Sequence, residues 1–333
     1  MTGYDVTLLS LGAGVQSTTL ALLAVEGVLP KTDVAIFGDT GWEPQAVYDL
    51  LEKLTTALVA AGIPVVHVSK GNLRDDTLDP NYPGIHVPAF IRSGNTKAER
   101  GGILSRQCTG SYKLDPIHRH TRKMLGATVT QRDCRYCNAT GRRIAPQAVK
   151  NGNNVEGVCS VCRGVGSVER VGSVRKGRVA ETWVGFSTDE IQRVSPSRVP
   201  YTVSTFPLLD LNMSRKDCER WLSSRGWSTT KSACIGCPFH GNRAWRALRD
   251  GSPVEWADAI AFDRDLRLMP GSVNRRDAQA FLHSSGLPLD VAPIDRVTSK
   301  EWREDQVSLI DLLAEDGDPD GCSPYGCRSG DAV

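Results

Sequence analysis

The chain has 333 residues, of which 40% are hydrophobic and 23% charged, and its formal net charge is +2. These values are ordinary for a globular protein with a substantial core; they argue against a disordered chain, and the overall charge indicates no partner. No signal-like segment opens the sequence, and no apolar run approaches the roughly 18 residues of a membrane helix, so we expect a cytoplasmic protein without a membrane partner.

The N-terminal part of the chain alternates between predicted strands and predicted helices. Apolar runs and apolar residues at helical spacing place strands at 5–11, 33–37 and 64–68 and helices at 17–25 and 45–61. Further along, ETWVGFS at 181–187 resumes a strand, and residues 215–225 and 253–268 have helical patterns. This order predicts an α/β fold with a doubly wound, mostly parallel sheet that helices cover on both faces. A ligand of such a sheet binds at the carboxyl ends of its strands.

Two short motifs follow the first two predicted strands. SLGAGVQST at 10–18 is a glycine-rich turn before a helix, which can offer backbone N–H groups to a phosphate; a glycine turn without a ligand is the alternative. In FGDTGWEP at 37–44, Asp39 could bind Mg²⁺ or a ribose hydroxyl, or could simply form the turn before Gly41. We predict that residues 8–45 bind the phosphates of a nucleotide. The predicted contacts are Ser10, Gly12, Gly14, Gln16, Ser17, Thr18, Asp39, Thr40 and Gly41.

The two motifs resemble those of the adenine nucleotide alpha hydrolase (PP-loop) superfamily, and within it the phosphoadenosine phosphosulfate (PAPS) reductase-like family. Residues 12–17 are similar to the SGGxDS loop of that family, with Gln16 where Asp is usual, and residues 39–44 resemble its DTG signature more closely. Later segments are also similar: RQC at 106–108 with Lys113 and Pro116, GFSTDE at 185–190 with Arg193, and FPLL at 206–209 with the helix after it. The resemblance covers most of 5–290, except the basic insert described below.

The resemblance implies an enzyme that binds ATP or a PAPS-like adenine nucleotide together with Mg²⁺. Most enzymes of the superfamily split ATP between its α and β phosphates and adenylate an oxygen, so that a nitrogen or sulfur nucleophile can displace AMP. Because charge develops on the phosphates, backbone donors and Lys or Arg side chains are the expected catalysts. By the resemblance, Asp39 takes part in catalysis, and the substrate contacts Lys113, Glu190, Arg193 and Arg198.

Eight of the ten cysteines form four close pairs, and in a cytosolic protein such pairs indicate metal or redox sites more often than disulfides. Cys234 and Cys237 form a CxxC followed by proline, a pattern of iron–sulfur ligands and redox dithiols, with a reduced pair in the core as the alternative. Relatives that thiolate tRNA hold a [4Fe–4S] cluster on three cysteines, and the resemblance implies such a cluster on Cys108, Cys234 and Cys237. The tail pair, Cys322 and Cys327, could be a resolving dithiol, a cluster ligand or a metal clip.

Residues 130–178 form a basic insert with ten Lys or Arg against three acidic residues, a net charge of +7, whereas the rest of the chain sums to −5. Two CxxC pairs lie within it, 21 residues apart, and each continues to a glycine, so that they resemble the zinc-binding repeats of DnaJ-type chaperones. The spacing predicts a structural Zn²⁺ on Cys134, Cys137, Cys159 and Cys162, and hence a small zinc-ribbon-like module. The charge predicts nucleic acid as a partner, with a solvated basic surface as the alternative.

We therefore expect three parts: a nucleotide-binding domain of residues 1–129 and 179–290, the zinc-binding insert at 130–178, and an extension at 291–333. The leading hypothesis is an ATP-dependent iron–sulfur sulfurtransferase that modifies nucleic acid with the help of a sulfur donor protein. One alternative is a sulfonucleotide reductase that uses thioredoxin, although the tail lacks the ECGLH-type cysteine motif of assimilatory reductases. The other alternative is a non-catalytic nucleotide-sensing or DNA-binding accessory protein.

Overall fold

Five parallel strands form the central sheet of the computed structural model, which describes residues 3–79, 87–93, 102–104, 106–144, 156–229, 232–268, 278–299 and 301–302. In chain order they are β1 (Val6–Leu11), β2 (Val34–Asp39), β3 (Val65–Ser69), β9 (Ala180–Trp183) and β10 (Thr202–Thr205). Their order across the sheet is β10-β9-β1-β2-β3, and every neighbouring pair is parallel. The chain builds the sheet outward from β1 first on one side and then on the other, which is consistent with a doubly wound fold. The predicted α/β fold with a parallel sheet is confirmed.

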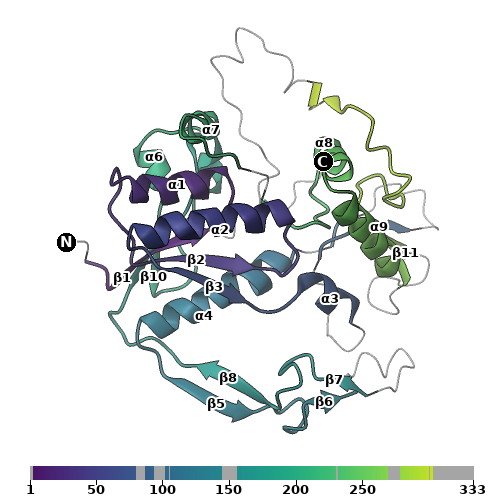
Figure 1. The fold of residues 1–333 in the computed structure, drawn as a ribbon. Helices are drawn as coiled ribbons and strands as arrows, with labels where there is room; N and C mark the ends of the chain where they lie inside the picture. The colour runs from purple at the N-terminus through teal and green to yellow at the C-terminus, as the bar shows by residue number, and fades with distance from the viewer. Residues whose placement is uncertain are drawn as a thin grey trace.

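Helices cover both faces of this sheet (Figure 1). One face carries α1 (Val15–Val25), α2 (Gln45–Ala60), α6 (Pro207–Asp210) and α7 (Arg215–Ser223), and the other carries α4 (Asp115–Met124). Alternate strand residues point to the two sides: Leu9 and Leu11 belong to the core under α1 and α2, whereas Leu8 packs with Ile117 of α4. Because both faces of the sheet are covered, the central strands β1 and β2 are mostly apolar along their whole length. None of the described helices is long and apolar enough to span a membrane.

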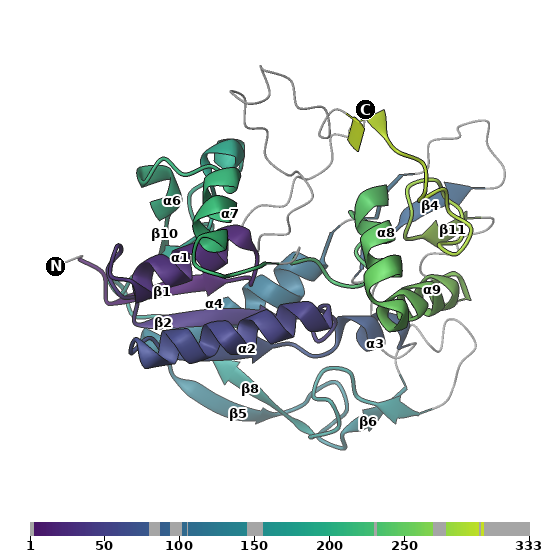
Figure 2. The ribbon, with the colours of Figure 1, turned by 45° about the horizontal axis from the view of Figure 1, so that its top comes forward.

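A second hydrophobic cluster lies at the end of the sheet to which the strands point (Figure 1, Figure 2). Its elements are α3 (Leu73–Leu78), α8 (Asn242–Gly251), α9 (Pro253–Leu268) and the antiparallel strands β4 (Phe90–Ser93) and β11 (Ala278–Phe281). Trp42, which follows β2, joins this cluster and packs against Phe262 of α9 with ring centroids 4.5 Å apart. The cluster therefore borders the carboxyl ends of the strands, where ligands bind in this fold class.

The basic insert leaves the main body below α4 as a narrow extension (Figure 1). Its base is an antiparallel ladder of β5 (Val129–Asp133) and β8 (Ser167–Val171), and its tip holds the short strands β6 (Arg142–Arg143) and β7 (Gly157–Val158). Nζ of Lys123 in α4 lies 2.8 Å from Oε2 of Glu169 in β8. This ion pair joins the ladder to the helix that covers the sheet.

Candidate nucleotide and thiol site

The loop after β1 is a tight turn whose N–H groups converge on one oxygen. Gly12 and Gly14 each donate a backbone N–H to Oγ of Ser17 at 3.2 Å, and Ala13 between them has a left-handed backbone with φ +52°. Gly14 is closely approached by Ser232, because a Cβ on the glycine would lie 2.7 Å from Oγ of Ser232. Neighbouring N–H groups that point to one side form a concavity suited to an anion. The two N–H groups therefore point to one side of the turn, where they bond Oγ of Ser17, and binding of a phosphate there stays a prediction.

Three hydroxyls of this loop are predicted to contact the nucleotide, and they differ in exposure. Ser10 and Thr18 are buried, with 4% and 0% of their surface exposed, and neither hydroxyl has a hydrogen-bond partner among the described residues. Ser17 is partly exposed. Ser17 is therefore the hydroxyl of the three that a nucleotide could reach without rearrangement of the loop.

The loop after β9 lies against the loop after β1, at the switch point of the sheet. Gly185 permits this contact, because a Cβ there would lie 3.1 Å from the carbonyl carbon of Gln16. Nε2 of Gln16 donates to Oε2 of Glu190 at 3.0 Å, and Glu190 also pairs with Arg193. Burial raises the pKa of Glu190, against the lowering effect of Arg193. These three predicted site residues form one group, whereas Arg198 is exposed.

Asp39 ends β2 and forms the turn that follows it. Its Oδ1 accepts hydrogen bonds from the backbone N–H of Gly41 at 2.7 Å and from the hydroxyl of Tyr48 at 2.9 Å. Gly41 has a left-handed backbone with φ +68°, and a Cβ there would lie 3.1 Å from Cα of Asn72. Burial and the Asp39 carboxylate raise the pKa of Tyr48, so the phenol stays protonated and remains a donor. The turn-forming role of Asp39 is confirmed, and its contact with Mg²⁺ or ribose stays a prediction.

Next to this turn, a buried network joins Glu43, Lys113 and Cys234. Oε1 of Glu43 accepts from Nζ of Lys113 at 3.0 Å and from the hydroxyl of Thr40 at 2.9 Å. Sγ of Cys234 lies 3.4 Å from that hydroxyl and 3.5 Å from Oε1 of Glu43. Glu43 is 4% exposed, and its Oε2 has no hydrogen-bond partner among the described residues. The thiol predicted to take part in sulfur chemistry therefore shares a buried polar network with the DTG turn.

Lys113 reaches Glu43 because η1 (Thr109–Leu114), a π-helical turn that leads into α4, crosses close to β2. At Gly38 of β2, a Cβ would lie only 3.2 Å from Cα of Lys113. Glu43 belongs to the DTGWEP motif, but that motif does not predict its pairing with Lys113. The signal that could have found it is Gly38, since a glycine inside an apolar strand often marks the close approach of another backbone.

The cysteine segments of the main body are joined by a stacking contact. The guanidinium of Arg106 lies 3.8 Å from the ring centroid of Phe239. Arg106 is two residues before Cys108, and Phe239 is two residues after Cys237. Cys108 and Cys234 also both contact the second hydrophobic cluster. The two segments that the iron–sulfur prediction combines are therefore neighbours in the fold.

Within the part of the chain that the structure describes, one group of three or more possible ligands is close enough to share a single metal ion, and it is the four-cysteine group of the insert. Cys108, Cys234 and Cys237 do not form such a group. A [4Fe–4S] cluster holds its thiolates farther apart than one ion does, so the cluster on these three cysteines stays a prediction. Cys322 and Cys327 lie outside the described residues.

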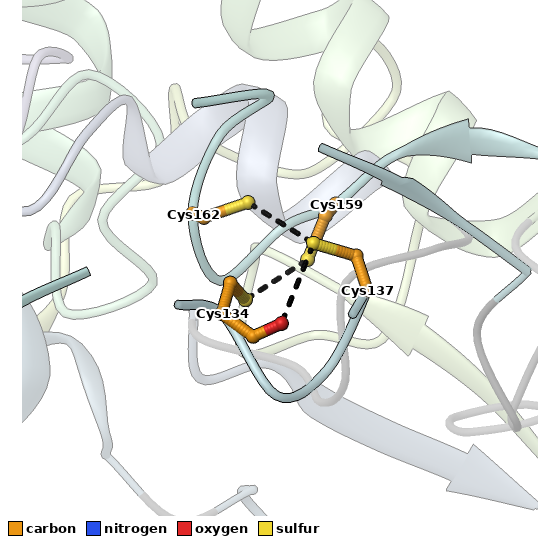
Figure 3. A group of neighbouring side chains, drawn as sticks. All are labelled: Cys134, Cys137, Cys159 and Cys162. Carbon is orange, nitrogen blue, oxygen red and sulfur yellow. Dashed lines mark hydrogen bonds between the residues drawn. The ribbon is translucent and has the colours of Figure 1, made fainter. Parts of the chain in front are cut away.

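The four cysteines of the insert converge on one point (Figure 3). All four Sγ atoms lie within 4.8 Å of one another, with 3.8 Å between Cys134 and Cys159 and 3.5 Å between Cys137 and Cys162. A tetrahedral ion with metal–sulfur bonds of about 2.3 Å holds its sulfurs about 3.8 Å apart. All four side chains are buried, as in a closed structural site. The donor set and its spacing fit a tetrahedral metal ion.

Two equivalent turns build this centre. Gly141 donates its N–H to Sγ of Cys137, and Gly166 donates to Sγ of Cys162, each at 3.3 Å. A Cβ would lie 2.2 Å from a backbone oxygen of the other turn at Gly141, and 2.3 Å at Gly166. Each of these N–H groups acts to lower the pKa of the thiol that it contacts. The pKa of Cys162 falls to about 7, whereas burial and the neighbouring thiols raise that of Cys137 to about 11. Both glycines are therefore required where the turns meet, and their N–H groups stabilise thiolates, the form that binds a metal.

Comparisons of the chain with models of known protein families, with curated proteins and with solved structures found no significant match. Function must therefore be inferred from the residues and their geometry.

Proposed function

We propose that the protein is an adenine-nucleotide-dependent enzyme of sulfur transfer. The observation that carries the proposal is the position of Cys234, whose Sγ lies 3.4 Å from the hydroxyl of Thr40 in the turn after β2. Two residues earlier, Ser232 comes so close to Gly14 that a Cβ on this glycine would lie 2.7 Å from its Oγ. One short segment, 232–234, therefore touches both loops that the motif resemblance assigns to the nucleotide.

In this proposal the glycine loop and the N-terminus of α1 bind the phosphates of ATP at the switch point. Ser17 donates its hydroxyl to a phosphate oxygen, and Asp39 binds Mg²⁺ or a ribose hydroxyl. ATP is split between its α and β phosphates, an acceptor oxygen takes the AMP, and pyrophosphate leaves. A sulfur nucleophile then displaces AMP. Lys113 and Arg193 provide positive charge near the two loops, where negative charge develops.

Cys108, Cys234 and Cys237 are the proposed ligands of a [4Fe–4S] cluster. Such a cluster would supply an open iron that carries sulfur. The contact between Arg106 and Phe239 supports this assignment, because it holds the segment of Cys108 beside the CxxC.

The insert is the proposed contact with nucleic acid. Tyr136 is 48% exposed, and the guanidinium groups of Arg135 and Arg143 lie 5.1 and 5.6 Å from its ring centroid. An exposed ring can stack on a base while arginines beside it contact phosphates. Zn²⁺ is the proposed ion of the four-cysteine centre, because four buried thiolates in a closed tetrahedral set are typical of structural zinc. Zinc would then fold the module that presents this surface.

Two assays test the proposal. Release of pyrophosphate from ATP should fall strongly in Ser17→Ala and should be unchanged in Ser224→Ala, which removes an exposed hydroxyl of α7's C-terminal end. Anaerobically purified protein should show the visible absorption of an iron–sulfur cluster and, after reduction with dithionite, an EPR signal, and Cys234→Ser should abolish both. ATP binding without pyrophosphate release would instead indicate an accessory protein that senses nucleotide. Sulfite release from PAPS with thioredoxin would indicate a sulfonucleotide reductase.

A further inference from the structure

Arg163, the residue after Cys162, extends from the insert to the main body. Its backbone belongs to the second turn of the metal centre, with a left-handed φ of +52° and an N–H that donates to the carbonyl of Cys159 at 2.7 Å. Its guanidinium donates two parallel hydrogen bonds to Asp76 of α3, at 3.0 and 2.6 Å. The backbone of Arg163 is therefore part of the candidate metal centre, while its guanidinium binds a residue of the main body.

Asp76 is a buried carboxylate, since its side chain is 8% exposed. Its Oδ2 also accepts a 2.6 Å hydrogen bond from the hydroxyl of Tyr112, a fully buried residue of the second hydrophobic cluster. Nζ of Lys70 lies 5.0 Å from the centroid of the Tyr112 ring, so a second cation is near. A bidentate pair of arginine and carboxylate is both strong and fixed in geometry. Loss of Arg163 would leave a buried carboxylate without its closest cation.

The main body is shaped to receive this arginine. Gly71, in the loop after β3, lies against the guanidinium, and a Cβ there would come within 2.0 Å of an Nη atom of Arg163. Its φ of +134° is a conformation that other residues rarely adopt. The guanidinium of Arg163, whose side chain is 42% exposed, thus contacts a buried carboxylate and lies against a glycine.

The contact leads directly to the candidate site. Tyr112 belongs to η1, which also carries Lys113 and begins directly after Cys108. We propose that Arg163 is a positioning residue: metal binding fixes its backbone, its guanidinium fixes Asp76 and Tyr112, and η1 is thereby held in place. The four-cysteine centre then does more than fold the insert, because it also orders the turn that carries Lys113. This proposal does not rest on the enzymatic function proposed above.

Amide hydrogen exchange of η1, measured by mass spectrometry on the full zinc-loaded chain, tests this coupling. Arg163→Ala should keep its zinc but speed exchange at residues 109–114 roughly tenfold or more, as expected for loss of a charge-assisted hydrogen bond. Arg163→Lys keeps a donor to Asp76 and should give an intermediate rate. Arg142→Ala removes an exposed arginine at the tip of the insert and should leave the rate unchanged. Arg163→Gly, which suits the left-handed backbone, replaces the alanine variant if that one loses zinc.

Removal of zinc by a chelator completes the test. In the wild type it should speed exchange of η1 about as much as Arg163→Ala does, and in the variant it should add little, because the connection is already lost. Unchanged exchange of η1 in zinc-loaded Arg163→Ala would overturn the proposal. So would a chelator effect on η1 of equal size in wild type and variant, since the two changes would then act independently.

Discussion

The two groups of cysteines in this protein are assembled in different ways. In the insert, four thiols from two CxxC pairs lie within 4.8 Å of one another, and backbone N–H groups of the same two turns bind them. In the main body, Cys108 and Cys234 come from distant parts of the chain, and Cys234 contacts Thr40 and Glu43 of a third segment. The first group is formed by two local turns, whereas the second is brought together only by the whole fold.

This difference separates a structural centre from a candidate reactive one. Thiols enclosed by one another and by backbone donors suit an ion that stays bound. A thiol beside a carboxylate, a lysine and a hydroxyl has neighbours that can exchange protons and hold charge. Variants of the two regions should therefore have different defects. Substitutions in the insert should cause loss of the metal, and substitutions in the main body should lower stability or ligand binding.

The largest effect is expected from loss of a ligand in the insert. Cys134→Ser should abolish zinc binding and unfold the two turns, because zinc contributes about 10–16 kcal/mol of apparent binding free energy in small zinc modules. Metal analysis, with hydrogen exchange of β5 and β8, measures both effects. Cys218→Ser, at a buried cysteine of α7, should retain the zinc. Equal zinc content in the two variants would contradict the assignment of the centre.

The next largest effect concerns the buried network of the main body. Lys113→Met should lower the free energy of unfolding by about 3–5 kcal/mol, because it leaves the Glu43 carboxylate buried without its cation. Asp295→Asn removes the exposed partner of Arg249 and should cost at most about 1 kcal/mol. Urea denaturation compares the two variants. If Lys113→Met lowers the free energy of unfolding by as little as Asp295→Asn does, this network contributes no more to stability than a surface ion pair.

The glycines of the insert allow a matched comparison. Gly141 and Gly177 both have left-handed backbones, with φ +77° and +90°, but a Cβ at Gly141 would lie 2.2 Å from a backbone oxygen, whereas Gly177 has nothing within 4 Å. Gly141→Ala should destabilise the metal-bound insert by about 2–4 kcal/mol, and Gly177→Ala by about 1 kcal/mol. Competition with a zinc chelator measures the difference. Equal losses of zinc affinity in the two variants would show that the two turns do not pack tightly against each other at Gly141.

The smallest effect is a pH dependence at the switch point. Burial raises the pKa of Glu190 above its ordinary 4.5, so between 4.5 and the raised value the folded state binds more protons than the unfolded state. The contribution of Glu190 to stability is therefore highest below pH 4.5 and falls as the pH rises through the folded pKa. Glu190→Gln should remove this fall, as measured by urea denaturation at increasing pH. The control variant Glu219→Gln, at an exposed residue, should still show this decrease in stability as the pH rises.

The sheet and the metal centre were predictable because both are encoded in local patterns. Continuous apolar runs located β1, β2 and β3 to within one or two residues at each end. The CxxC spacing identified the four thiols that the structure brings together. Contacts between distant charges were not predictable: Arg163 and Asp76 are 87 residues apart, and their meeting depends on how the insert folds back on the main body. No local sequence pattern predicts which buried charged residues will pair.

The burial of Ser10 and Thr18 has a similar cause. The motif places both residues near the glycine turn, Ser10 at the end of a strand and Thr18 in a helix. The motif alone does not tell whether their side chains point to the core or to the ligand side, because this depends on how the strand and the helix pack. Of the three hydroxyl side chains Ser10, Ser17 and Thr18, only that of Ser17 belongs to a partly exposed residue. Motif membership therefore identified the loop but not which of its hydroxyls a ligand can reach.

Alkylation of the core cysteines in the presence of ATP tests whether nucleotide and thiol chemistry share one site, as we propose. Peptide mass spectrometry gives the rate at each cysteine separately. In protein prepared without the cluster, saturating ATP with Mg²⁺ should slow alkylation of the half-buried Cys237 and of Cys234, because residues 232–234 touch both loops that are proposed to bind the nucleotide. Ser17→Ala should weaken this protection. ATP that binds while both cysteines react at unchanged rates would contradict the account.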